Sequence, residues 1–301
     1  MTSTQAMPRV SAEKARQLVV QHGGITPAAR ASNIPYGNLY RAYNAYMSED
    51  NSHKVCVFSD THVQLGVCNK HLTWIGKWLK DANPAFIIQN GDFGDFPSMC
   101  GHEPNETAKG KLKPSLKRDL DYFEECVQII SKASGRSDIV FVEGNHEGPR
   151  ILKYEDFHPE TQGMLFSRYE EILRNGKWQR IPYGRHYNLL GVDFVHSPMN
   201  GKSQPTGGML AVKNVAQKSI KDTVFSHTHK GGVHIEAKFG NDEHTTALNT
   251  GHTMPIGYVP DYASNGMRGW VSGVVELVIQ HGKIRDHSFI SMETLRDRYD
   301  Q

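Results

Sequence analysis

The chain of 301 residues exceeds the usual domain of roughly 100 to 200 residues and fits one catalytic domain with a small appendage. Its 34 basic and 32 acidic side chains leave a formal charge of +2, which excludes a general attraction to polyanions. Any affinity for nucleic acids would therefore have to come from a local cluster of charge. The four cysteines lack a C-x-x-C spacing, so we exclude a zinc knuckle and a disulfide framework.

The sequence contains nothing that resembles a signal peptide and no window of about 18 apolar residues that could span a bilayer. We therefore expect a cytoplasmic protein that makes no membrane contacts. The oligomeric state does not follow from the sequence.

The first 50 residues have the pattern of three short helices. Ser11 and Thr26 are residue types that cap helix N-termini, and we expect each of them to begin a helix. Residues 1–50 should therefore form a small three-helix segment, and residues 51–301 the main domain. The three helices are expected at 11–22, 27–32 and 36–47.

The stretch from Gly24 to Arg41 contains a short alanine-rich helix, a turn and the start of the next helix. This order resembles the helix-turn-helix domains of bacterial and phage DNA-binding proteins. In that family the last helix enters the major groove, and here it would present Asn38, Arg41 and Asn44 to DNA. The alternative is a docking or dimerisation module that uses the tyrosines of the third helix as its contact surface.

Five apolar segments of the main domain predict buried strands, because β-branched and aromatic residues suit a covered sheet. Each segment is followed by side chains that bind metal ions. Since the carboxyl ends of strands in α/β sheets meet where ligands bind, we expect these side chains to converge. The strands are expected at 54–59, 85–90, 138–142, 191–195 and 222–226, followed by Asp60-x-His62, Gly91-Asp92-x-x-Asp95, Gly144-Asn145-His146-Glu147, His196 and His227-x-His229.

Amphipathic helices alternate with these strands and predict parallel βαβ units. The helices are expected at 69–81, 115–133, 161–175 and 209–219. After His229 the pattern becomes antiparallel, and His281-Gly282 suits a tight hairpin. We expect these later strands to form a second sheet packed on the first, at 233–239, 245–250, 270–280 and 283–290.

In this order, the five polar groups resemble the motifs of the calcineurin-like metallophosphoesterases, over residues 54–290. The resemblance implies an α/β fold, a four-layer α/β/β/α sandwich, with two divalent metal ions at the carboxyl ends of the strands. Carboxylate and imidazole ligands suit Mn²⁺, our first choice, or Fe or Zn²⁺. The implied ligands are Asp60, His62 and His229 for one ion, Asn145, His196 and His227 for the other, and Asp92 as the bridge between them.

The resemblance also implies a mechanism in which a hydroxide between the two metal ions attacks phosphorus. His146 would donate a proton to the leaving oxygen, and Asp95 would orient that imidazole. Asn145 and His252 are expected to contact the substrate. Glu147 is expected to serve the structure of its loop.

Two features depart from the pattern of related enzymes. Ser226 stands where the family usually has the glycine of a Gly-His-x-His motif, which affects backbone freedom rather than a ligand. Phe96 and Pro149 stand where protein Ser/Thr phosphatases of this superfamily carry arginines that grip a phosphomonoester. The absent arginines disfavour a protein phosphatase and favour a phosphodiester, which carries less charge.

The loop 97–114 follows Asp95 and carries a basic cluster at Lys109, Lys111 and Lys113, which is either a solvated surface or a contact for a polyanionic substrate. We expect a metal-dependent phosphodiesterase or nuclease whose N-terminal segment recruits DNA, since tethering raises the local substrate concentration. One alternative is a phosphodiesterase or phosphatase for small or cyclic nucleotides whose N-terminal helices serve assembly. The other is a non-catalytic DNA-binding protein with a structural metal site.

Overall fold

The computed structural model describes residues 10–22, 24–47, 51–101, 110–239, 243–260, 263 and 269–300. The chain forms two compact units, Met1–Ser52 and His53–Gln301. Among the described residues, no helix is both long enough and apolar enough to cross a membrane. Lys109, which belongs to the predicted basic cluster, lies outside the described residues.

The first unit contains the helices α1 (Ala12–Gln21), α2 (Ile25–Ser32) and α3 (Tyr36–Tyr46). Ser11 caps α1 as predicted, because its side chain accepts a hydrogen bond from the Lys14 backbone. The predicted cap at Thr26 is wrong, since α2 begins at Ile25 and Gly24 occupies the cap position. The predicted three-helix segment is confirmed, and its core is formed by Ala15, Leu18, Val19, Ala28 and Leu39.

One sheet of the second unit has the strand order β11-β10-β1-β2-β3-β4. Strands β1 to β4 are parallel, so their carboxyl ends lie at one edge of the sheet. The hairpin of β10 and β11 adds antiparallel to β1. The bounds are β1 (His53–Phe58), β2 (Phe86–Gln89), β3 (Ile139–Val142), β4 (Gln179–Ile181), β10 (Gly273–Gln280) and β11 (Lys283–Ser291).

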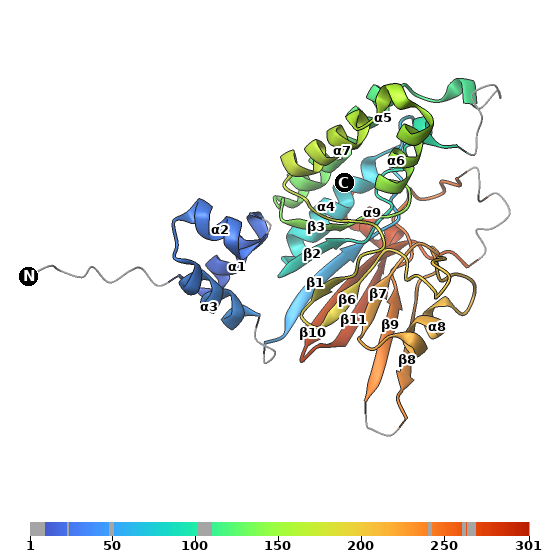
Figure 1. The fold of residues 1–301 in the computed structure, drawn as a ribbon. Helices are drawn as coiled ribbons and strands as arrows, with labels where there is room; N and C mark the ends of the chain where they lie inside the picture. Colours follow the sequence, from blue (N-terminus) through green and yellow to red (C-terminus); the bar gives the residue numbers. More distant parts are fainter. Residues whose placement is uncertain are drawn as a thin grey trace, which may run out of the picture. The chain divides into compact units, whose positions relative to one another are not determined.

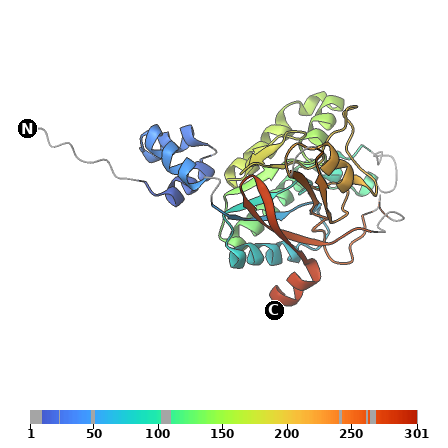
Figure 2. The ribbon, with the colours of Figure 1, turned by 90° about the horizontal axis from the view of Figure 1, so that it is seen from below.

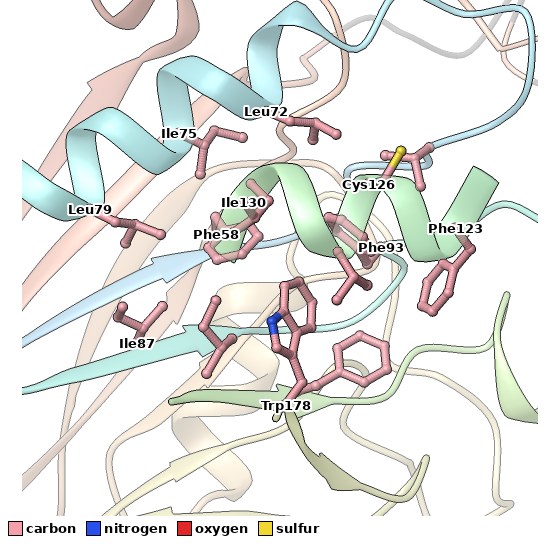
Figure 3. Close-up of a cluster of buried hydrophobic side chains, with 14 of the residues drawn as sticks. Phe58, Leu72, Ile75, Leu79, Ile87, Phe93, Phe123, Cys126, Ile130 and Trp178 are labelled. Carbon is pink, nitrogen blue, oxygen red and sulfur yellow. The ribbon is translucent and has the colours of Figure 1, made fainter. Parts of the chain in front are cut away.

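Helices cover the outer face of this sheet (Figure 1). Leu72, Ile75 and Leu79 recur at helical spacing on α4 and pack towards Phe58 and Ile87 of the strands (Figure 3). Fully burying one such aliphatic side chain stabilises the fold by about 1.5–3 kcal/mol, so this cluster holds the layer in place. The covering helices are α4 (Lys70–Ala82), α5 (Leu116–Ser134), α7 (Met164–Asn175) and α9 (Met292–Tyr299).

The second sheet has the strand order β5-β6-β7-β9-β8. Helix α8 (Ala211–Lys218) covers its outer face, where Val215 packs in a buried cluster with Val195, Phe225 and Ala247. The bounds are β5 (Tyr187–Leu189), β6 (Val192–Phe194), β7 (Thr223–Phe225), β8 (Gly232–Ala237) and β9 (His244–Asn249).

The two sheets pack face to face between the helices (Figures 1 and 2). On β1, Cys56 and Phe58 belong to the cluster under the helices, and the alternate residues Val55 and Val57 are also fully buried. Because side chains alternate between the two faces of a strand, the second sheet must cover Val55 and Val57. The predicted four-layer α/β/β/α sandwich is confirmed.

The predicted composition of the second sheet is wrong in one respect. Strands β10 and β11 join the first sheet, because β10 pairs with β1 from His53↔Ile279 to Val57↔Val275. The second sheet instead begins with β5, β6 and β7, and β9 runs parallel to β7. Alternation in a sequence identifies a strand but not its partner, which explains the error.

Several short elements were not predicted. Strands β4 and β5 have three residues each, too few to show a period. Helix α6 (Gly148–Phe157) begins with glycine and proline, which are typical of loops. The other unpredicted elements are α9 and the 3-10 turns η1 (Pro97–Met99), η2 (Gly110–Leu112) and η3 (Pro159–Thr161).

Candidate metal centre

The loops after β1, β2, β3, β6 and β7 bring the seven predicted ligands to one place. Asn145 Oδ1 lies 3.2 Å from His196 Nε2 and so joins the ligand group of His196. His146 also lies in the cluster, although it was predicted as a proton donor. Ligand atoms lie within 4.8 Å of one another in three groups: Asp60, His62 and His229; Asp92, His196 and His227; and His62, Asp92 and His146.

The first group has the spacing that a single metal ion requires. His229 Nε2 lies 3.0 Å from Asp60 Oδ1 and 3.2 Å from His62 Nε2. Ligand atoms bound about 2.1 Å from one ion lie roughly 3–3.5 Å apart, so a cation fits between these three side chains. Asp60 and His62 are almost completely buried, which keeps competing water away from them.

The second group has a similar spacing. His196 Nε2 lies 3.1 Å from Asp92 Oδ2, and the Asn145 amide oxygen faces the same nitrogen. Within the described part of the chain, the buried Nδ1 atom of His227 has no hydrogen-bond partner. A buried imidazole nitrogen without a partner is costly unless it meets a ligand, so the donor set fits a second cation.

Two further contacts link these groups to His146. Its Nδ1 atom lies 2.6 Å from Asp95 Oδ1, and its Nε2 atom lies 4.0 Å from Asp92 Oδ2. The same Asp95 oxygen lies 3.5 Å from His62 Nδ1. Burial would raise the pKa of the Asp95 carboxyl, but hydrogen bonds from His146 and His62 outweigh burial and hold that pKa below its ordinary range.

The carboxylates and imidazoles of the centre shift each other's pKa. Burial opposes the charged form of Asp92, but His196 and His146 outweigh burial and hold its carboxyl pKa well below the ordinary range. Burial likewise opposes the charge on His196, but Asp92 raises the His196 pKa to about 10. Burial and the charge of His196 lower the pKa of His227 to about 4. In the metal-free protein, a proton on His196 therefore balances buried negative charge.

The backbone around the centre is strained. Asp60, His62, Asp92, His227 and His229 have left-handed φ values of 48°, 49°, 49°, 70° and 58°. Such conformations cost on the order of 1–3 kcal/mol per residue and cluster at functional sites. These left-handed conformations direct several ligands from short loops towards one point. The alternation of apolar and polar residues in the sequence does not predict them.

Glycine is required where two loops meet behind the ligands. A Cβ atom on Gly144 would lie 2.1 Å from Asp92 Oδ1 and 2.3 Å from the Asp92 backbone nitrogen. Glu147 binds both loops, because it accepts hydrogen bonds from the backbone N–H groups of Gly94 and Gly144, each at 2.9 Å. Glu147 therefore has the structural part expected from the sequence.

Ser226 has a contact that its sequence position did not reveal. Its Oγ atom lies 2.5 Å from the Asn90 carbonyl oxygen and 3.0 Å from His196 Nδ1. The same carbonyl lies 2.9 Å from His196 Nδ1. These contacts direct the opposite nitrogen, Nε2, towards Asp92 and Asn145, as second contacts of metal-binding histidines commonly do.

His252 lies beside the first ligand group, with its ring centre 5.8 Å from that of His229. Its side chain is only 6% exposed, and Trp270 packs against both histidines. Burial lowers the pKa of His252 to about 3, so the imidazole is neutral near pH 7. Contact with substrate remains a prediction for His252 and for Asn145.

The three residues predicted to contact DNA lie on α3 of the first unit. Arg41 and Asn44 are exposed, and Asn38 is partly buried. The Arg41 guanidinium donates a 2.9 Å hydrogen bond to Asn38 Oδ1. DNA binding by these residues remains a prediction.

The carboxylate, amide and imidazole groups gathered at the strand ends of this two-sheet α/β sandwich are suited to bind metal ions that activate water for hydrolysis. The chain belongs to the calcineurin-like phosphoesterase family, whose profile matches residues 53–253. Among solved structures, the chain is similar to YfcE, a phosphoesterase from E. coli, with 14% identity and a TM-score of 0.35 over 79% of this chain and 100% of that chain. No curated protein matches the sequence.

Proposed function

We propose that the protein is a phosphodiesterase that uses two divalent metal ions. The position of Asp92 carries this proposal, because its Oδ2 atom lies 3.1 Å from His196 Nε2 in one ligand group and 4.0 Å from His62 Nε2 in the other. A carboxylate in this position is suited to bridge two cations. Bound cations would supply Lewis-acid activation of water and of the phosphoryl oxygens.

The donor set of the seven ligands favours Mn²⁺, with Fe or Zn²⁺ as alternatives. It combines hard oxygen donors with imidazole nitrogens and contains no thiolate. The first ion would be held by Asp60, His62 and His229, the second by Asn145, His196 and His227, and Asp92 would contact both.

His146 is proposed to give a proton to the leaving oxygen. Its Nδ1 atom is held by Asp95, which leaves Nε2 on the side of Asp92 and the metal centre. A carboxylate that fixes one nitrogen of a histidine sets the direction of the other, as general acid catalysis requires. This pair favours an enzyme over a protein with a structural metal site, because a structural site needs no proton donor.

The preference for a diester is supported by the two positions that lack arginine. The Phe96 side chain is 1% exposed, and its ring packs 5.0 Å from that of Phe123 in the core. It therefore cannot contact a phosphate, and Pro149 has no side-chain donor. A phosphodiester needs less positive charge than a monoester, which suits a site without those two arginines.

The test compares diester and monoester turnover by one preparation. Bis(p-nitrophenyl) phosphate and p-nitrophenyl phosphate would be assayed with Mn²⁺, Fe²⁺ or Zn²⁺ after chelation. We expect metal-dependent hydrolysis with a higher kcat/KM for the diester. A higher kcat/KM for the monoester would refute the diester assignment, and cyclic nucleotides in the same assay test the small-nucleotide alternative.

DNA is proposed as the polymeric substrate because positive charge is concentrated in the first unit. The first unit, Met1–Ser52, contains five basic and three acidic side chains, so it accounts for the whole chain's net charge of +2. A local positive charge attracts the phosphate backbone without any overall basicity. In this proposal, Asn38, Arg41 and Asn44 of α3 contact DNA and the second unit cuts it.

A further inference from the structure

An arginine that no expectation from the sequence included contacts the proton-donor pair. Arg150 lies in the first turn of α6, three residues after Glu147. Its Nη1 atom donates a hydrogen bond to the main-chain carbonyl of Asp95 and lies 3.4 Å from Asp95 Oδ1. The Arg150 side chain is 15% exposed, so water screens this contact only in part.

The two contacts fix different parts of Asp95. One holds its main chain, which turns into a left-handed conformation at the next residue, Phe96, with φ 46°. The other faces the carboxylate oxygen that also lies 2.6 Å from His146 Nδ1. The Arg150 guanidinium therefore limits rotation of the Asp95 carboxylate and movement of the loop that carries it. Through Asp95 it also fixes the direction of the His146 ring.

The surroundings of Arg150 do not favour direct contact with substrate phosphate. Its charge lies beside Asp95 and also acts on Asp119, whose pKa burial raises to about 6 against a smaller opposing effect of Arg150. A guanidinium that contacts one carboxylate and acts electrostatically on a second carboxyl group offers less charge to a phosphate. A charged hydrogen bond to a carboxylate is strong and directional, which suits a positioning role.

We propose that Arg150 is a positioning residue that holds Asp95, and through Asp95 the imidazole of His146, in the direction needed to protonate the leaving oxygen. This inference rests on the proposed function, since it assumes that His146 is the proton donor. Arg150 is added to the proposed mechanism as the residue that keeps the Asp95–His146 pair rigid.

The test uses two diesters that differ in their need for a proton. p-Nitrophenolate, released from bis(p-nitrophenyl) phosphate, is a weak base and leaves without a proton. Phenolate, released from diphenyl phosphate, is a stronger base and needs one. The variants are Arg150→Met, Arg150→Lys and, as a control, Lys153→Met, which removes an exposed positive charge from the same helix.

For Arg150→Met we expect kcat on diphenyl phosphate to fall about 10- to 100-fold, a part of the full effect of a general acid. Turnover of bis(p-nitrophenyl) phosphate should fall only a few-fold, with KM and bound metal unchanged. Arg150→Lys should recover part of the loss, and Lys153→Met should match the parent.

A second measurement does not depend on activity. In the metal-free protein, the ¹⁵N shifts of the His146 ring, assigned by their loss in His146→Ala, report which nitrogen carries the proton. We expect a proton fixed on Nδ1 in the parent and in Lys153→Met, and a mixture of tautomers in Arg150→Met. The Lys variant keeps this measurement accessible if the Met variant does not fold.

Three results would overturn the inference: equal losses on both diesters, a raised KM that marks Arg150 as a substrate contact, or an unchanged His146 tautomer in both variants. If the parent hydrolyses neither diester with any of the metals, the proposed function fails instead. In that case the ¹⁵N shifts alone decide whether Arg150 positions the ring.

Discussion

Nδ1 of His146 lies 2.6 Å from Oδ1 of Asp95, although the two residues come from the loops after different strands. Parallel pairing of β2 with β3 brings these loops together at one edge of the first sheet. His146 forms one ligand group with His62 and Asp92, and Asp95 lies 3.5 Å from His62 Nδ1. The contact between His146 and Asp95 nevertheless directs His146 Nε2 towards Asp92. In the proposed mechanism, the pair would therefore separate proton transfer from metal binding within one cluster.

Replacement of His146 by alanine should separate these two functions. Without the proton donor, kcat on diphenyl phosphate should fall by roughly 10²–10⁴-fold, whereas bis(p-nitrophenyl) phosphate should lose less because its leaving group needs no proton. Metal content, measured by mass spectrometry, should stay at the parental level. A loss of bound metal would instead assign His146 as a ligand, an arrangement that its spacing from His62 and Asp92 permits.

Addition of Mn²⁺ to chelated protein should raise the melting temperature, because an ion that binds only the folded chain stabilises it. Asp92→Asn should abolish most of this rise, since Asp92 lies between both ligand groups. Glu236→Gln is the matched control, as it removes a partly exposed carboxylate on β8 that belongs to none of the three ligand groups. Differential scanning fluorimetry checks the result, and an Asp92→Asn protein that keeps two tightly bound ions would contradict the bridging role.

The ligands of the centre follow from local patterns, because a buried strand that ends in Asp-x-His can be identified within a few residues. The contacts that orient the ligands depend on residues far apart in the chain. Ser226 Oγ meets the Asn90 carbonyl across 136 positions, and Arg150 meets Asp95 across 55. Only the packed fold brings such pairs together, so they could not be predicted from one sequence.

The same limit explains the error in the sheets. β10 and β11 form the hairpin that His281-Gly282 predicts, and the hairpin itself is confirmed. Its pairing with β1, more than 200 residues earlier, depends on which edge of the first sheet is open. Nothing within the hairpin sequence specifies that edge.

Asp119 should make the stability of the protein depend on pH between about 4 and 6. Burial raises the pKa of Asp119 to about 6, so in that range the folded chain binds more protons than the unfolded chain. Stability contributed by the protonated form is therefore complete below about pH 4 and is lost as the pH rises through 6. The loss is on the order of 1–3 kcal/mol.

The neutral variant Asp119→Asn tests this dependence. Its amide oxygen can still accept the hydrogen bonds from the Ser98 backbone N–H and hydroxyl, which lie 3.0 and 2.7 Å from Asp119 Oδ2. Urea unfolding of chelated protein should show the variant more stable than the parent at pH 7.5 and similar to it at pH 4.5. A difference that does not change with pH would show that Asp119 does not titrate in this range.

Removal of residues 1–50 should separate DNA binding from hydrolysis. The first unit has its own buried core, so its deletion should leave turnover of bis(p-nitrophenyl) phosphate by the second unit unchanged. Affinity for duplex DNA, measured by fluorescence anisotropy, should fall at least about 10-fold, because the concentrated positive charge is lost.

In the full chain, Arg41→Gln should lower the salt dependence of DNA binding by about one phosphate contact. Arg285→Gln, which removes an exposed charge from β11 in the second unit, should leave the salt dependence of binding unchanged. Equal effects of the two variants would mean that charge alone, rather than the face of α3, governs the affinity for DNA.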